Sequence, residues 1–149
     1  MKRIFTAIVA TAFLALAITT PARAQLPGTA MRAYIPFAFM VNGKTLPAGN
    51  YEVKRITEEP EGLIIRSLDN KHDHAVFETE STQQNRLPRH DEIVFDRYGE
   101  SYFLSEVLAG GTETGRKLAP SRAEKQLRRE MESASNNNTQ AETVSIALY

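Results

Sequence analysis

Residues 34–41 read Tyr-Ile-Pro-Phe-Ala-Phe-Met-Val and carry the clearest structural pattern in the chain. Large apolar side chains occupy every second position, at residues 35, 37, 39 and 41, so they fall on one face of a β-strand. Pro36 cannot donate an amide hydrogen bond, which favours an edge position or a bulge. Asn42-Gly43 follows, and this dipeptide readily adopts the positive φ of a tight hairpin turn. The stretch therefore predicts the first strand of an antiparallel sheet.

The two-residue alternation continues outward from this strand as far as Leu108. Further alternating or β-branched stretches are residues 51–56, 63–68, 74–80, 92–97 and 102–108. No helix-length apolar pattern lies between them, so antiparallel pairing is expected. We predict an all-β domain, a small antiparallel sandwich or barrel of about six strands. The polar residues from Ser81 to His90 are expected to form its longest loop, and Gly110 to Lys117 a flexible connection to the next element.

One helix is predicted near the C-terminus. Ser121-Arg122-Ala123-Glu124 matches a capping box, in which the serine and glutamate side chains satisfy each other's backbone amides. Ala123, Leu127 and Met131 then form a narrow apolar stripe at helical spacing. We expect a helix over residues 119–133.

The residues after this helix have a different composition. Ser, Asn, Thr and Gln dominate after Ser133, which predicts a disordered tail over residues 134–149. Val144, Ile146 and Leu148 nevertheless alternate before the terminal Tyr149. The alternative is therefore a strand that joins this chain's own sheet or a partner's edge.

The N-terminal residues have the layout of a secretory signal peptide. Lys2 and Arg3 precede an uncharged, mostly apolar run, and Ala22-Arg23-Ala24 places small residues where a signal peptidase reads them. The run is shorter than the roughly 20 residues that a membrane-spanning helix needs. We predict a signal peptide at residues 1–24, cleavage before Gln25, and a periplasmic or extracellular protein without a transmembrane anchor. The β-domain is expected to cover residues 25–118.

Composition excludes several classes of function. The 149 residues include 18 Lys and Arg against 18 Asp and Glu, so no strong charge indicates a nucleic-acid partner. Cysteine is absent, which excludes disulfides, thiol catalysis and Cys-ligated metal clusters. Tryptophan is absent as well, so no indole is present on which a sugar could stack.

Three histidines are the candidate metal ligands. His72 and His74 are two residues apart, so on a strand they project to the same side, and His90 could join them if the strands are adjacent. Imidazole with carboxylate suits zinc, copper or nickel. The alternative is a solvated turn, because Lys71-His72-Asp73 reads as the turn of a hairpin.

No pattern in the sequence indicates catalysis. The acids among residues 78–106 alternate with apolar or neutral residues, as solvent-facing strand positions do, and no nucleophile-elbow context surrounds the serines. We therefore predict no catalytic residue, no bound cofactor and no enzymatic activity.

Two longer segments of the chain have a distinctive pattern. They are residues 35–53, with Asn42-Gly43-Lys44-Thr45-Leu46-Pro47-Ala48-Gly49 at their centre, and residues 98–107. Both resemble a family of small exported bacterial β-proteins. Gly115-Arg116-Lys117-Leu118 and Ser121-Arg122-Ala123-Glu124 match the end of the same pattern. The resemblance covers residues 33–130 and implies an exported β-fold. It implies no activity and no functional residue.

These observations predict an exported, non-enzymatic β-domain that acts by binding or as an envelope-associated protein. One alternative is a carrier of a small apolar ligand or a glycan, its interior lined by Phe37, Phe39, Phe77, Phe95 and Phe103. The other is transition-metal binding at His72 and His74. The sequence does not identify the partner, for which an envelope protein and a small ligand are the candidates.

Overall fold

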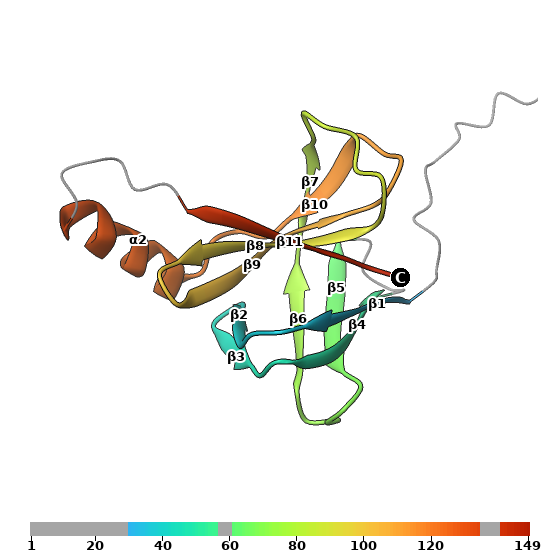
Figure 1. The fold of residues 1–149 in the computed structure, drawn as a ribbon, viewed down its shortest axis with the longest axis horizontal. Helices are drawn as coiled ribbons and strands as arrows, with labels where there is room; N and C mark the ends of the chain where they lie inside the picture. Colours follow the sequence, from blue (N-terminus) through green and yellow to red (C-terminus); the bar gives the residue numbers. More distant parts are fainter. Residues whose placement is uncertain (1–29, 57–60, 135–140) are drawn as a thin grey trace, which may run out of the picture.

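The chain is seen in a computed structural model that describes residues 30–56, 61–134 and 141–149 (Figure 1). The predicted signal peptide and the cleavage before Gln25 lie outside the described residues. Within them the chain forms eleven strands and one helix, so the predicted all-β class with a C-terminal helix is confirmed. The elements are β1 (Met31–Ile35), β2 (Phe39–Val41), β3 (Lys44–Leu46), β4 (Gly49–Arg55), β5 (Gly62–Ser67), β6 (His74–Glu78), β7 (Glu80–Gln83), β8 (Glu92–Tyr98), β9 (Ser101–Leu108), β10 (Thr114–Lys117), α2 (Arg122–Ala134) and β11 (Glu142–Ala147).

The strands form two sheets. The first has the order β1-β4-β5-β6, and the second has the order β11-β8-β9-β10-β7. All neighbours along both paths are antiparallel. The short β2-β3 hairpin attaches to the second sheet where Met40 lies opposite Phe103 in a parallel bridge. Pro36 lies just beyond β1, so it leaves the ladder intact.

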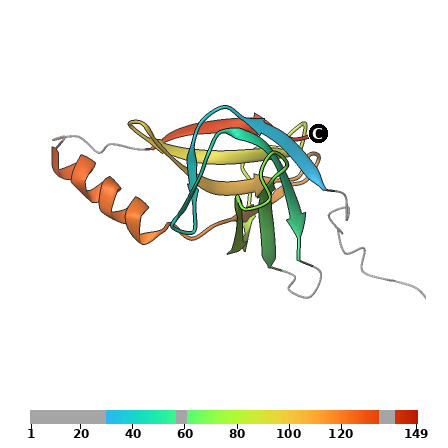
Figure 2. The ribbon, with the colours of Figure 1, turned by 90° about the horizontal axis from the view of Figure 1, so that it is seen from below.

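The two sheets are joined on both sides, which closes them into a barrel. On one side only Thr79 separates β6 from β7, so one bent strand passes from the first sheet into the second. On the other side Arg32 and Tyr149 exchange two backbone hydrogen bonds, of 3.0 and 2.9 Å. Figure 2 shows β1 and β11 side by side at this junction. The sequence left the choice between sandwich and barrel open, and the terminal residue decides it.

Apolar side chains from both sheets fill the middle of the barrel. Phe39, Tyr51 and Phe95 are at most 1% exposed. The Phe39 ring meets both other rings edge to face, with centroids 5.1 and 5.3 Å apart. Phe77 belongs to the same buried cluster, and Phe37 packs against it. The rings of Phe37, Phe39, Tyr51 and Phe95 therefore pack on one another, while Phe77 also borders a concavity beside β6.

The prediction of a disordered tail is wrong for residues 142–149. β11 pairs with β8 from Glu142 to Ala147, and Val144 and Ile146 pack against the core. Leu148 is buried in the core at 7% exposure. The alternative prediction, a strand that joins the chain's own sheet, is therefore confirmed. Polar composition misled the prediction because the solvent-facing half of a strand is polar too.

Two further strands lie where the sequence predicted irregular structure. β7 occupies the start of the expected loop, and β10 occupies part of the expected flexible connection. β10 lies between β7 and β9 and pairs with both, yet Gly115 is its one buried residue. Such a strand is defined by backbone hydrogen bonds and by its neighbours, so its side chains carry little apolar pattern.

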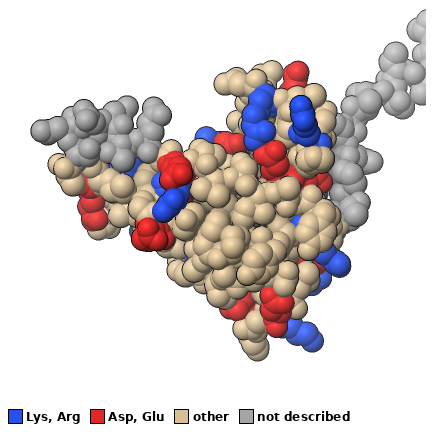
Figure 3. All heavy atoms as spheres, in the orientation of Figure 1, with Lys and Arg blue, Asp and Glu red and all other residues tan. Residues whose placement is uncertain are grey.

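The helix begins later than predicted, at Arg122 instead of residue 119. The capping box is formed: the Ser121 hydroxyl accepts a hydrogen bond from the Glu124 amide at 3.2 Å, and the Glu124 carboxylate accepts one from the Ser121 amide at 3.3 Å. Of the predicted stripe, Leu127 and Met131 are half-buried while Ala123 is exposed. The helix extends away from the barrel in the ribbon views (Figures 1 and 2) and in the space-filling view (Figure 3). Across the described ranges, no helix is both long and apolar enough to cross a membrane.

Candidate functional site

A hollow of about 320 Å³ lies at the end of the barrel where β9 leads into β10. Its floor is apolar and nearly buried: Leu63, Val107 and Leu108 are 4%, 4% and 2% exposed. Its rim is polar. The full lining is Met31, Arg55, Leu63, Ser81, Asp91, Val107, Leu108, Ala109, Gly110, Thr112, Thr114, Gly115 and Arg116. A volume of this size suits a small molecule.

The turn between β9 and β10 forms one wall of the hollow and is fixed by backbone contacts. The Gly110 amide donates to the Asp91 carboxylate at 2.7 Å, and the Gly111 amide donates to the Pro88 carbonyl at 2.8 Å. A Cβ atom on Gly110 would lie 2.9 Å from the backbone carbonyl carbon of His90. Only glycine allows this approach. The wall is therefore held in place before any ligand arrives.

Two arginines, Arg55 and Arg116, lie at the rim of the hollow. The acid in the lining, Asp91, is already engaged by the Gly110 amide. Guanidinium groups bind carboxylate, sulfonate and phosphate oxygens through paired hydrogen bonds. The lining combines buried apolar residues with two arginines, so it can hold a small molecule with an apolar body and an anionic head.

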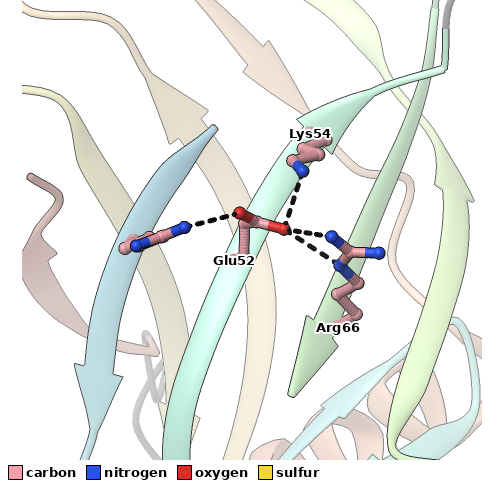
Figure 4. Close-up of polar contacts among 4 residues, drawn as sticks. Glu52, Lys54 and Arg66 are labelled. Carbon is pink, nitrogen blue, oxygen red and sulfur yellow. Dashed lines mark hydrogen bonds and ion pairs between the residues drawn. The ribbon is translucent and has the colours of Figure 1, made fainter. Parts of the chain in front are cut away.

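A second polar arrangement lies on the four-stranded sheet (Figure 4). It is on the opposite face from the core, because Tyr51 and Val53, the neighbours of Glu52 in β4, are buried in the core. Glu52 of β4 is 2% exposed. Arg32 and Arg66 face it across the strands on either side. Its carboxylate lies 3.4 Å from Arg32, 3.0 Å from the Lys54 ammonium and 2.7 Å from Arg66. Burial opposes ionisation of Glu52, but the hydrogen bonds from Lys54 and Arg66 outweigh it and lower the pKa. The carboxylate therefore clamps three neighbouring strands together.

Two carboxyl groups near the start of α2 have raised pKa values, in contrast to the lowered pKa of Glu52. Burial raises the pKa of Glu124, and the charge of Asp96 raises it further. Burial also raises the pKa of Asp96, against a hydrogen bond from Ser105. These carboxyls hold protons to a higher pH than usual. Glu124 already serves as the N-terminal cap of the helix, so its position has a structural cause.

The predicted metal ligands stay on the surface. His72, His74 and His90 are all exposed. The carbonyls of His72 and His74 accept hydrogen bonds from Lys44 at 3.3 and 2.8 Å. In the part of the chain that the structure describes, no three His, Cys, Asp or Glu side chains come close enough to hold a metal ion. Metal binding at His72 and His74 stays a prediction.

Comparisons with protein-family models, with curated proteins and with solved structures found no match. Sequence reasoning missed the hollow, since its lining comes from strand ends far apart in the chain. The one local signal was Gly110-Gly111, which marked a turn without showing what the turn would enclose.

Proposed function

We propose that the protein is an exported, non-enzymatic binding protein that takes a small amphipathic anion into the hollow at the end of its barrel. One observation carries the proposal: a nearly buried apolar floor lies beneath a rim with two arginines. The apolar floor favours an amphipathic molecule over a glycan. Of the phenylalanines predicted to line a carrier's interior, Phe37, Phe39 and Phe95 pack on one another in the core. Phe77 and Phe103 line a separate concavity beside β6, so the proposed site at the end of the barrel uses none of the five.

Binding is favoured over catalysis by the groups that surround the hollow. Catalysis by an acid or base needs a titratable group free to exchange a proton with a substrate. The Asp91 carboxylate already accepts a hydrogen bond from the Gly110 amide, and arginine does not release its proton in proteins. The remaining polar lining consists of hydroxyl and backbone groups, which orient a ligand.

Export is proposed from the pattern of residues 1–24. Fractionation of the native host with N-terminal sequencing should find Gln25 first, in the periplasm or the medium. A cytoplasmic product that retains Met1 would contradict export, while leaving the proposal for the hollow untouched.

The hollow can be tested with two related fluorescent probes. 8-Anilinonaphthalene-1-sulfonate has an apolar body and an anionic sulfonate, and N-phenyl-1-naphthylamine has almost the same body without the charge. Both should bind the folded protein at one saturable site. Arg116→Met should lower the affinity for the sulfonate probe about tenfold, because a charge-assisted hydrogen bond is lost. The same variant should leave the uncharged probe nearly unchanged.

Two variants complete the experiment. Arg122→Met makes the same chemical change on the exposed start of α2 and should alter neither affinity. Ala109→Phe places a large ring on the floor and should reduce the binding of both probes. Near-UV circular dichroism must confirm native packing, since the sulfonate also binds loosely packed states. Equal sulfonate affinity in the Arg116 and Arg122 variants would refute the proposed role of the rim.

A further inference from the structure

A second concavity, separate from the hollow at the barrel end, opens through the wall of the barrel beside β6. Its volume is about 440 Å³. Val76, Phe77 and Glu78 of β6 form one side, and Phe103, Leu104 and Leu118 lie among the residues that line the rest. It exists because the bent strand changes partners. β7 pairs with β10, while β6 pairs with β5 on its opposite edge.

The backbone of β6 presents unpaired groups to this groove. In an antiparallel pair, the two residues of a bonded pair exchange hydrogen bonds, and bonded pairs alternate with non-bonded ones. The Ser67 amide donates a hydrogen bond to the Asp73 carbonyl at 2.7 Å, and the Thr79 amide donates one to the Glu61 carbonyl at 3.0 Å. The odd-numbered residues of β6 therefore exchange backbone hydrogen bonds with β5. The amides and carbonyls of the even-numbered residues point the other way.

An independent contact supports this assignment. Lys44, which lies on the far side of β6 from β5, donates to the His74 carbonyl at 2.8 Å. His74 is even-numbered and its carbonyl does point outward. Val76 and Glu78 follow in the same orientation, and among the described residues β6 has β5 as its only strand partner. An unpaired strand edge is a template for another extended chain.

The geometry points to an extended peptide segment of a partner protein, carrying basic side chains, that adds as a strand to the Val76–Glu78 edge of β6. Main-chain hydrogen bonds to Val76 and Glu78 would supply affinity, and alternate side chains would enter the groove. Its apolar residues, Phe103, Leu104 and Leu118, accept an aliphatic side chain. The exposed acid Glu78 also lines the groove, so lysine or arginine complements its charge.

The test uses a fluorescein-labelled peptide, Lys-Val-Lys-Val-Lys-Val-Lys, and fluorescence anisotropy. Two N-methylated versions carry the methyl groups on alternate residues, one set on the lysines and the other on the valines. Strand addition directs only one of these sets toward β6. One version should therefore lose at least about tenfold in affinity, and the other should bind nearly as well as the parent. Equal affinity of the two versions would overturn the proposal, and so would failure of the parent peptide to bind.

Variants of the protein test the same edge from the other side. Val76→Pro removes an outward amide without removing a hydrogen bond to β5, so it should lower the affinity for the peptide at least about fivefold. Val76→Ala keeps the amide and should have little effect. Glu78→Gln should weaken the lysine peptide, and a peptide with glutamate in place of lysine should not bind. If the free protein sediments as a dimer that Val76→Pro converts to a monomer, a second copy covers this edge and the proposal is wrong.

Discussion

Removing the last two residues, Leu148 and Tyr149, tests how the barrel is closed. Leu148 is 7% exposed and belongs to the core cluster. The Leu148 amide donates a hydrogen bond to the Asp91 carbonyl at 2.7 Å, and Tyr149 exchanges two backbone hydrogen bonds with Arg32. Without these residues the described structure has no hydrogen bond between β1 and the end of β11. The deletion therefore leaves the rest of the chain intact but opens the barrel on one side.

The size of the effect follows from what is lost. Burial of a leucine side chain stabilises by roughly 2 kcal/mol, and three backbone hydrogen bonds contribute about 3 kcal/mol together. Ordering two residues costs about 3 kcal/mol. The deletion should therefore lower the free energy of unfolding by about 2 kcal/mol, which for a domain of this size lowers the Tm by about 8 °C.

Thermal melts followed by circular dichroism, together with urea titrations, measure this difference. Tyr149→Ala is the matched control. It removes a side chain that is 81% exposed but keeps both backbone bonds, so it should change the Tm little. If the deletion shifts the Tm no more than the control does, the terminal residues do not close the barrel and the reasoning fails.

Three further predictions concern the charged residues and the turn of the hollow. Glu52→Gln should cost about 1–2 kcal/mol near neutral pH. Because the folded pKa of Glu52 is lowered, this cost should shrink as the pH falls through that pKa, and a pH-independent cost in urea titrations would contradict it. Glu124→Gln should show the opposite trend, because the folded pKa of Glu124 is raised. The wild type therefore loses stability as the pH rises from the unfolded to the folded pKa. Over the same pH range the variant should become more stable relative to the wild type. Urea midpoints that show no such gain would refute the assignment. Gly110→Ala should cost about 1–3 kcal/mol and weaken N-phenyl-1-naphthylamine, because its Cβ would meet the His90 backbone; unchanged melting and binding would show that the wall can move.

Local patterns were sufficient for the parts of the fold that depend on side-chain type. Alternation around Phe39 predicted one strand with a buried face over residues 34–41. The buried face is confirmed, since Phe39 is 1% exposed, but the stretch is divided into β1, which ends at Ile35, and β2, which begins at Phe39. The Ser121 and Glu124 capping box predicted a helix, and its two hydrogen bonds are formed, although the helix begins at Arg122 and not at residue 119. In each case the signal and the structure lie within a few residues of each other, so no knowledge of distant contacts was needed.

The candidate sites had no such signal. The floor of the hollow brings Leu63 beside Val107, and these residues are far apart in the sequence. In the sequence each is simply an apolar residue of a strand. The free edge of β6 was also invisible, because β10 pairs with the other half of the same bent strand. A hollow and a free edge are properties of how strands meet, so composition and periodicity do not report them.

The amino-acid sequence alone determined that strands would alternate between a buried and an exposed face, because that alternation is written in neighbouring side chains. Tertiary structure alone decided that the two sheets close into a barrel. Closure depends on Tyr149 reaching Arg32 through backbone groups. Every residue but proline carries those groups, so no side-chain pattern could show which would meet.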